Sequence, residues 1–139
     1  MKSKLKKNMD LPHNNTYTRI GISQIPNAGV GIIAIKDIPK DAYIFYPDDD
    51  KLIWVNENKI KDLPDSIKKL YIDFCVKKDN LYGCPVSFNK LTPAWYLNNS
   101  DNPNVYADDE FRFKALRDIK EGEELTSEYS SYSDSVDDF

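Results

Sequence analysis

Short runs of β-branched and aromatic residues dominate the first half of the sequence. Turn-forming residues separate these runs, at residues 26–27, 39–41 and 47–50. Short apolar runs divided by Pro, Asn and Asp are typical of a β-rich domain. The strands that this pattern predicts are residues 16–22, 30–35, 42–46, 51–55 and 81–84.

One stretch changes to the period of a helix. Apolar residues recur there at the spacing of one helical face, and they are Ile67, Leu70, Tyr71, Phe74 and Cys75. Asp62 is the expected N-cap, with Pro64 in the first turn. We expect this apolar stripe to pack against the core rather than to form a ligand surface.

Three further segments carry polar patterns. Residues 97–104 combine asparagines with a pre-proline residue, which predicts an irregular loop that presents side-chain amides. Residues 111–115 alternate like one arm of a hairpin after a turn at Asp108–Asp109. Residues 123–129 also alternate, which predicts a short strand that ends on the aromatic hydroxyl of Tyr129.

A weak internal echo relates residues 34–38 to residues 115–119. Each copy runs from Ala through a charged pair to Ile, and each is followed by a charged turn. The echo predicts two small sheets that are built alike, and it concerns packing rather than chemistry.

Length and charge restrict the classes of function. The 139 residues, 40% of them hydrophobic, suffice for one domain over residues 16–132, between a basic segment (1–15) and an acidic tail (133–139). The net charge of −4 argues against a dedicated nucleic-acid binder, which needs a basic face. A cationic partner such as a lysine-bearing peptide fits this charge better.

The sequence lacks several other signals. No apolar run approaches the roughly 18 residues that a membrane span requires, and the first ten residues lack the apolar stretch of a signal peptide. We therefore expect a soluble, intracellular protein. Cys75 and Cys84 are too few for a zinc cluster or a disulfide scaffold, so we expect no metal, two reduced thiols and Cys75 in the core. The single histidine, His13, gives a histidine-dependent hydrolase little support.

Each polar motif has a structural and a functional interpretation. Gly29 and Gly31 are compatible with a plain turn or with close approach of the backbone to a ligand. The asparagines of residues 98–104 cap turns, or they grip a heterocycle edge or an amino-acid head group, because amides both donate and accept. Tyr129 packs on the core, or it places its hydroxyl in a narrow tunnel.

Taken in order, these motifs resemble the SET-domain protein lysine methyltransferases. Residues 29–31 are similar to the family's Gly-x-Gly turn, residues 97–104 to its Asn-His-Ser…Pro-Asn loop, and residues 123–129 to its Glu-Glu-Leu-Thr…Tyr ending. The resemblance covers about residues 20–132. It implies a mainly β fold (the β-clip of SET domains) of small curved sheets with one helical insertion. It also implies a C-terminal pseudoknot, in which the last strand threads beneath the asparagine loop.

The resemblance also implies a site. S-adenosylmethionine would be the methyl donor, and a lysine-containing protein or peptide would be the acceptor. The residues that it places at the donor are Gly29, Val30, Gly31, Asn98, Asn99 and Tyr132. It assigns Tyr129 as the catalytic tyrosine and places Tyr46 and Tyr106 along the lysine tunnel.

The chain departs from the family pattern at three points. Asn99 stands where the family has histidine, and Trp95 and Tyr96 stand where it often has a basic residue and phenylalanine. The zinc-binding cysteines that follow the catalytic region in many relatives are absent. Two alternatives to an active enzyme follow. One is a SET-like module without turnover that binds a peptide or protein partner, and the other is a compact interaction protein whose turns imitate the motifs.

Overall fold

The structure is a computed structural model, which describes residues 12–45 and 51–135. Its larger sheet has the strand order β1 (Thr18–Ile22), β2 (Val30–Ala34), β9 (Glu124–Ser127), β7 (Val105–Ala107) and β8 (Phe113–Ala115), and β6 (Asn98–Asn99) also pairs with β9. A smaller sheet has the order β3 (Ile53–Asn56), β5 (Leu81–Cys84) and β4 (Val76–Lys78).

Helical structure is limited to one α-helix and several short 3-10 helices in the described residues. The α-helix is α1 (Asp65–Phe74). The 3-10 helices are η2 (Pro12–Asn15), η3 (Glu57–Lys59), η4 (Phe88–Lys90), η5 (Pro93–Tyr96) and η6 (Tyr129–Ser131). The predicted fold class, mainly β with small curved sheets and one helix, is confirmed.

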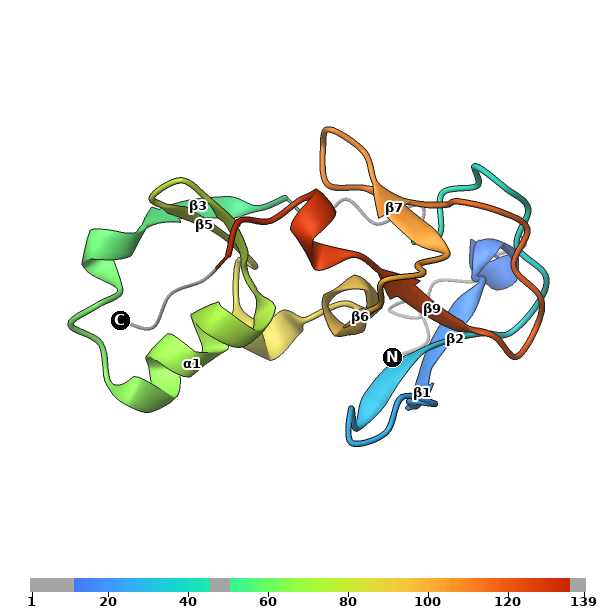
Figure 1. The fold of residues 1–139 in the computed structure, drawn as a ribbon, viewed down its shortest axis with the longest axis horizontal. Helices are drawn as coiled ribbons and strands as arrows, with labels where there is room; N and C mark the ends of the chain where they lie inside the picture. Colours follow the sequence, from blue (N-terminus) through green and yellow to red (C-terminus); the bar gives the residue numbers. More distant parts are fainter. Residues whose placement is uncertain (1–11, 46–50, 136–139) are drawn as a thin grey trace, which may run out of the picture.

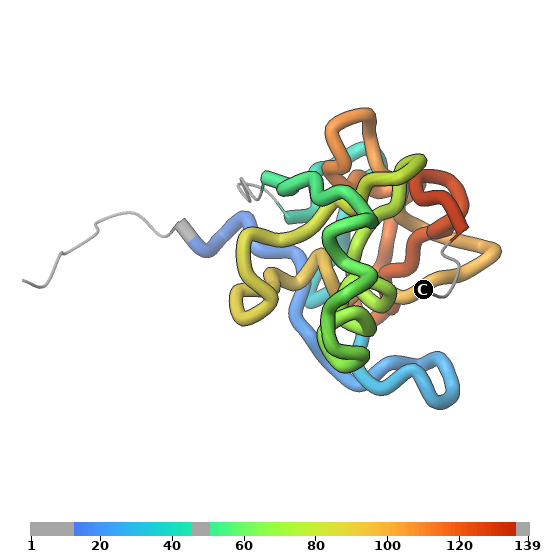
Figure 2. Tube along the Cα trace, turned by 90° about the vertical axis from the view of Figure 1, so that its left-hand side faces the viewer, coloured from blue at the N-terminus to red at the C-terminus, as the bar shows by residue number. Residues whose placement is uncertain are grey.

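The two sheets lie at opposite ends of the long axis (Figure 1). The smaller sheet and α1 form one end, and β1, β2, β7 and β9 form the other. The view along that axis shows the end that contains α1 in front of the larger sheet (Figure 2). The chain enters the smaller sheet after residue 50, leaves it after residue 84 and then returns to the larger sheet.

Each sheet has its own buried cluster. The cluster of the larger sheet is almost entirely aliphatic and consists of Ile32, Ala34, Ile38, Ile44, Leu97, Val105, Ala115, Ile119 and Leu125. The cluster of the smaller sheet consists of Ile60, Cys75, Tyr82 and Cys84. A buried Ile or Leu contributes about 2 kcal/mol relative to an exposed one, so the aliphatic cluster carries most of the hydrophobic stabilisation.

Strand β9 passes beneath the loop that joins β6 to β7. The Ser100 N–H donates to the Ser127 carbonyl at 3.0 Å, and the Asn104 N–H donates to the Thr126 carbonyl at 3.2 Å. Successive carbonyls of a strand point to opposite edges, so the two ends of the loop lie on opposite edges of β9. This is the crossing that the resemblance implied for the pseudoknot.

The two similar segments, residues 34–38 and 115–119, pair with each other. Ile38 and Ile119 form an antiparallel bridge, with reciprocal N–H···O bonds of 2.8 Å in both directions. Both side chains are buried in the aliphatic cluster. The prediction of two sheets built alike is therefore wrong, because the copies meet at one place in a single core.

Most predicted strands are present with shifted ends, and residues 81–84 form a strand with the predicted bounds. Residues 42–46 were wrongly predicted as a strand, because the described part of this segment forms only an isolated bridge between Tyr43 and Lys114. Strand β9 is buried along its whole length, because it lies in the middle of the sheet.

The helix was predicted correctly in type and wrongly in detail. Its N-cap is Pro64, without a side-chain hydrogen bond, and Asp62 does not cap it. None of its residues is buried, and Ile67 remains 40% exposed. Tyr71 packs its ring against Tyr82 (6.3 Å between centroids), and Cys75, which follows the helix, is buried as expected. The stripe is therefore only partly a core face.

In the described residues, no helix combines the length and the apolar character that a membrane crossing requires. Cys75 and Cys84 are both free thiols.

Candidate active site

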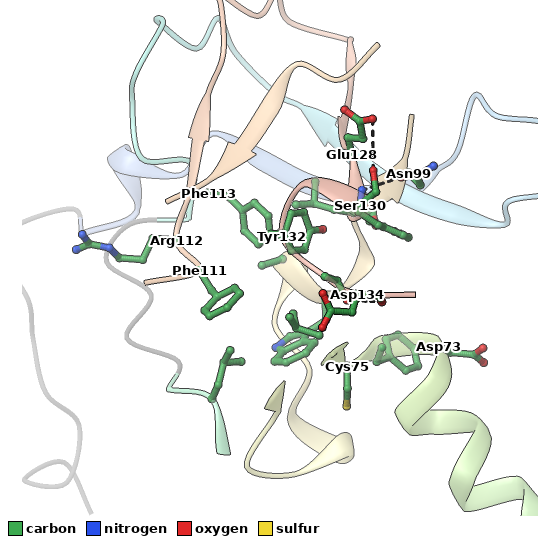
Figure 3. A pocket seen from close by; sticks show the side chains of 18 of the residues that line it. Asp73, Cys75, Asn99, Phe111, Arg112, Phe113, Glu128, Ser130, Tyr132 and Asp134 are labelled. Atoms are coloured by element: carbon green, nitrogen blue, oxygen red, sulfur yellow. Dashed lines mark hydrogen bonds between the residues drawn. The ribbon is translucent and has the colours of Figure 1, made fainter. Parts of the chain in front are cut away.

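A cavity of about 660 Å³ lies between the two ends of the molecule. Its wall combines residues from the end of α1, the turn before β8, helix η5 and the segment that follows β9. In Figure 3, the rings of Phe113 and Tyr132 lie next to each other, and Cys75 and Asp134 lie below them in the view. This volume is in the range of small-molecule sites, about 300–1,000 Å³.

Tyr129 lines this cavity at the start of η6. Its hydroxyl donates to the Leu97 carbonyl, and its backbone N–H donates to Asn99 Oδ1 at 2.8 Å. The residue is 41% exposed, but the hydroxyl end is held against the chain. Burial raises the pKa of the Tyr129 hydroxyl, so the phenol is neutral at physiological pH.

Tyr132 forms a second aromatic wall. Its hydroxyl lies 2.8 Å from Ser127 Oγ, and its ring packs edge-to-face on Phe113 and Tyr129 at centroid distances of 5.6 and 6.3 Å. Burial raises the pKa of Tyr132 to about 12, although the Ser127 hydrogen bond acts in the opposite direction. Ser127 itself is fully buried, so it fixes the tyrosine from within the sheet.

A separate polar cluster surrounds Glu124 at the other end of β9. Glu124 Oε1 accepts the Gln24 N–H at 2.7 Å, and Oε2 accepts Ser23 Oγ at 2.8 Å and Asn98 Nδ2 at 3.0 Å. Asn98 Nδ2 also donates to the Val30 carbonyl at 3.0 Å. The cluster therefore ties the β1–β2 turn to the asparagine loop through one carboxylate. None of these residues is in the wall of the cavity.

The two glycines of the turn are required for different reasons. Gly29 has a φ of +78° and open space around it, so it serves the backbone conformation of the turn. A Cβ on Gly31 would lie inside the contact distance of Glu124 Oε2 and 3.0 Å from Asn98 Nδ2. The missing side chain at Gly31 thus makes room for the Glu124 cluster.

The charge around the cavity is negative. Among the residues that the structure describes, one basic side chain, Arg112, lines it, and this side chain pairs with Asp108 at 3.0 Å and with Glu110 at 3.7 Å. The acidic residues in the cavity wall are Asp73, Asp101, Glu110, Glu128 and Asp134. An opening with this balance favours cationic groups over anionic ones.

The predicted site residues that the fold brings together form two groups. Asn99, Tyr129 and Tyr132 come together at the cavity. The four residues Gly29, Val30, Gly31 and Asn98 come together at the Glu124 cluster or in the turn beside it. The loop between β6 and β7 joins the two groups, since Asn98 and Asn99 are adjacent in β6.

Of the two predicted tunnel residues, only Tyr106 lies within the described residues. Tyr106 is not in the cavity wall, and its hydroxyl reaches toward Asp41 Oδ1 at 3.5 Å. The reason is the alternation of side chains along β7, where Val105 takes the buried position. Tyr46 lies outside the described residues.

Other residues of the site were missed by sequence reasoning. They are Ser23, Gln24, Phe113, Glu124 and Ser127. Glu124 and Ser127 belong to a motif that was recognised, but nothing in the sequence shows which of its polar residues turn inward. Ser23 and Gln24 meet Glu124 across about one hundred positions of sequence, and this contact has no local signal.

Within residues 12–45 and 51–135, no three His, Cys, Asp or Glu side chains gather as a metal site. The buried side-chain nitrogens and oxygens of this part all have hydrogen-bond partners.

Comparisons with known proteins identify the family and the fold. The SET domain profile matches residues 29–130, which is most of the chain. Curated protein sequences give no significant match. Among solved structures, the chain is similar to an inhibitor-bound, humanized mutant of Chaetomium thermophilum Polycomb Repressive Complex 2 (TM-score 0.59, 18% identity, 85% of this chain and 15% of the other).

Two further structures show the same fold. One is the Chaetomium thermophilum complex in an autoinhibited conformation, bound to S-adenosylmethionine (TM-score 0.58, 16% identity, 85% and 16% coverage). The other is a Plasmodium falciparum protein assigned as a histone methyltransferase (TM-score 0.52, 17% identity, 80% and 90% coverage). The chain spans 15–16% of the Polycomb chains that it matches, so the likeness concerns one domain. From the profile match and the fold together, the chain belongs to the SET-domain family.

Proposed function

We propose that this protein transfers a methyl group from S-adenosylmethionine to the side-chain amine of a lysine in a protein substrate. The observation that carries the proposal is the placement of the Tyr129 hydroxyl. This hydroxyl is bound to the Leu97 carbonyl beside the asparagine loop, in the wall of a cavity with aromatic and acidic residues. The family membership and the S-adenosylmethionine bound to a structural neighbour support it.

The residues present fit such a donor. Asn98 directs Nδ2 toward Val30 and Glu124, so its Oδ1 faces away from these acceptors and is able to accept from an ammonium group. Asn99 uses Oδ1 for the Tyr129 N–H, and among the described residues its Nδ2 has no hydrogen-bond partner. Tyr132 and Phe113 offer flat surfaces for a heterocycle. When bound, S-adenosylmethionine supplies an electrophilic methyl group on a cationic sulfur.

Tyr129 would orient the acceptor amine. Because its proton is donated to the Leu97 carbonyl, the oxygen lone pairs are left to accept an N–H from the incoming lysine. A neutral phenol suits this role, and burial keeps the pKa of Tyr129 raised. A fixed acceptor would direct the amine lone pair along one line, which is the main requirement of an in-line displacement.

The lysine must also lose its proton. Its reference pKa of about 10.4 falls when the amine is buried or lies beside a positive charge. An aromatic cavity wall that includes Phe111, Phe113 and Tyr132 provides such burial. The carboxylates of the wall would attract the charged lysine at the opening, and the interior would favour its neutral form.

A second candidate function is a SET module that binds a protein partner without turnover. Two observations favour it. Asn99 stands where the family has the ring of a histidine, and four of the six residues predicted to hold the donor lie outside the cavity wall, namely Gly29, Val30, Gly31 and Asn98. The SET profile match does not favour the third alternative, a protein whose turns merely imitate the motifs.

Calorimetric titration with S-adenosylmethionine, followed by incubation with labelled donor and a cell extract, separates the candidates. An active enzyme binds the donor and labels one or more acceptor proteins on lysine. Donor binding without labelled protein would favour the inactive module. Absence of donor binding would contradict the proposed function.

A further inference from the structure

We propose that Glu124 is a positioning residue of the donor site, whose carboxylate sets the orientation of the Asn98 amide against the strand that begins at Val30. This inference rests on the proposed function, because it assigns a role to Glu124 in holding the methyl donor. Glu124 is not itself placed in contact with the donor or the acceptor lysine.

The carboxylate is buried and held only by neutral donors. Its residue is 9% exposed, and among the described residues no Lys or Arg pairs with it. Hydrogen bonds from Ser23, Gln24 and Asn98 take the place of a counter-ion. A buried charge is costly unless its oxygens are bonded, so this arrangement keeps all three donors directed at Glu124.

Two of the donors each require an acceptor oxygen at position 124, and an amide side chain there has only one. The Gln24 N–H is a backbone donor and meets Oε1 at 2.7 Å, whereas Asn98 Nδ2 meets Oε2 at 3.0 Å. A glutamine at position 124 has one oxygen and one NH₂ group, so either orientation sets its NH₂ against one of these donors. Only a carboxylate accepts from both.

The orientation of Asn98 follows from this bond. With Nδ2 bound to Glu124 and to the Val30 carbonyl, the amide oxygen faces away from the cluster. Asn98 Nδ2 also donates to Ser23 Oγ at 3.3 Å, so the amide has three acceptors, and loss of the Glu124 bond removes one of them. The amide is then able to turn and to offer its NH₂ group where a cationic ligand needs an acceptor.

The missing side chain of Gly31 also supports the contact between Glu124 and Asn98. A Cβ there would meet both Glu124 Oε2 and Asn98 Nδ2, so the turn leaves space for this contact. The glycine, the carboxylate and the amide thus form one packed unit.

The test compares Glu124→Gln with Glu123→Gln. The control removes the same charge at the neighbouring position, where the carboxylate pairs with Arg117 at 2.9 Å, away from the cluster. In calorimetric titration with S-adenosylmethionine we expect about tenfold weaker binding for Glu124→Gln and binding within about twofold of wild type for the control. In a methylation assay, the KM for the donor rises in Glu124→Gln, while kcat at saturating donor changes by less than about twofold.

The outcomes separate this inference from the proposed function. If the wild type does not bind the donor, the proposed function fails. If the wild type binds and a folded Glu124→Gln binds equally well, the positioning role is wrong. Should Glu124→Gln not fold, Ser23→Ala removes one bond to each carboxylate oxygen. We then expect about threefold weaker donor binding from Ser23→Ala. Unchanged binding would show that Glu124 has a purely structural role.

Discussion

The two ends of β9 lie in contrasting surroundings. At the first end, the Glu124 carboxylate is surrounded by hydrogen-bond donors of the protein itself. Gly31 leaves the space that this carboxylate occupies, because it has no side chain. At the other end, Tyr129 and Tyr132 line a cavity of about 660 Å³. The first end is a closed arrangement that fixes geometry, and the second is open to a ligand. Changes at the first end should therefore affect stability and donor binding, and changes at the second should affect turnover and ionisation.

The strongest test of the open end is Tyr129→Phe. The change removes the hydroxyl that is bound to the Leu97 carbonyl and leaves the ring in the cavity wall. We expect the rate of lysine methylation to fall by about a hundredfold or more, with donor affinity and melting temperature close to those of wild type. A rate equal to that of wild type in a radiometric assay would contradict the catalytic assignment.

The closed end is tested by Gly31→Ala. The added methyl group would overlap Glu124 Oε2 and crowd Asn98 Nδ2, so we expect a loss of about 3 kcal/mol in the free energy of unfolding. Gly29→Ala is the matched control, because its surroundings are open and only its φ of +78° is unfavourable, at about 1 kcal/mol. Equal losses in urea unfolding would show that the cluster does not restrict position 31.

At the open end, the ionisation of Tyr132 makes the free energy of unfolding depend on pH. Its pKa is about 12 in the folded protein and 10.0 in the absence of burial, so the folded state holds the proton more tightly. Its stabilising contribution is complete below pH 10 and is lost as the pH rises from 10 to 12. Relative to Tyr132→Phe, the wild type should lose about 1–2 kcal/mol over this range, a value reduced for the partly exposed ring. Parallel stability curves of the two proteins would contradict this expectation.

The smallest expected effect concerns Ser127→Ala. This change removes the 2.8 Å hydrogen bond to the Tyr132 hydroxyl, at a cost of about 1 kcal/mol. Because that bond lowers the pKa of Tyr132, its loss should raise the pKa further. Spectrophotometric titration of tyrosinate measures the shift, and a downward shift would show that Ser127 does not stabilise the ionised phenol.

The sequence predicted local features better than contacts between distant segments. The strand at residues 81–84 and the type of α1 follow from the periodicity of nearby residues. The inward orientation of Glu124 does not, because it depends on Ser23 and Gln24 far away in the sequence. The resemblance to a family supplied the crossing of β9 beneath the asparagine loop, which no local pattern indicates.

The candidate site was predictable to a similar extent. The resemblance to the family led to Asn99, Tyr129 and Tyr132, which the fold brings to one cavity. The interpretation of Tyr106 depended on its spacing from the loop, and the alternation of β7 turns this residue elsewhere. Which face a residue occupies depends on the register of strand pairing, and pairing between distant strands is not visible in one sequence.

The central position of β9 has a consequence for how the chain folds. Without β9, the larger sheet separates into the β1–β2 and β7–β8 hairpins, which have no partner in common. Residues 124–127 leave the ribosome after all the other described strands, so the sheet cannot close during synthesis of the preceding segments. The native contacts of β9 with β2 span about ninety residues, and such distant pairing slows folding. Assembly of this domain is therefore expected to be late, slow and dependent on the pairing of this one short strand.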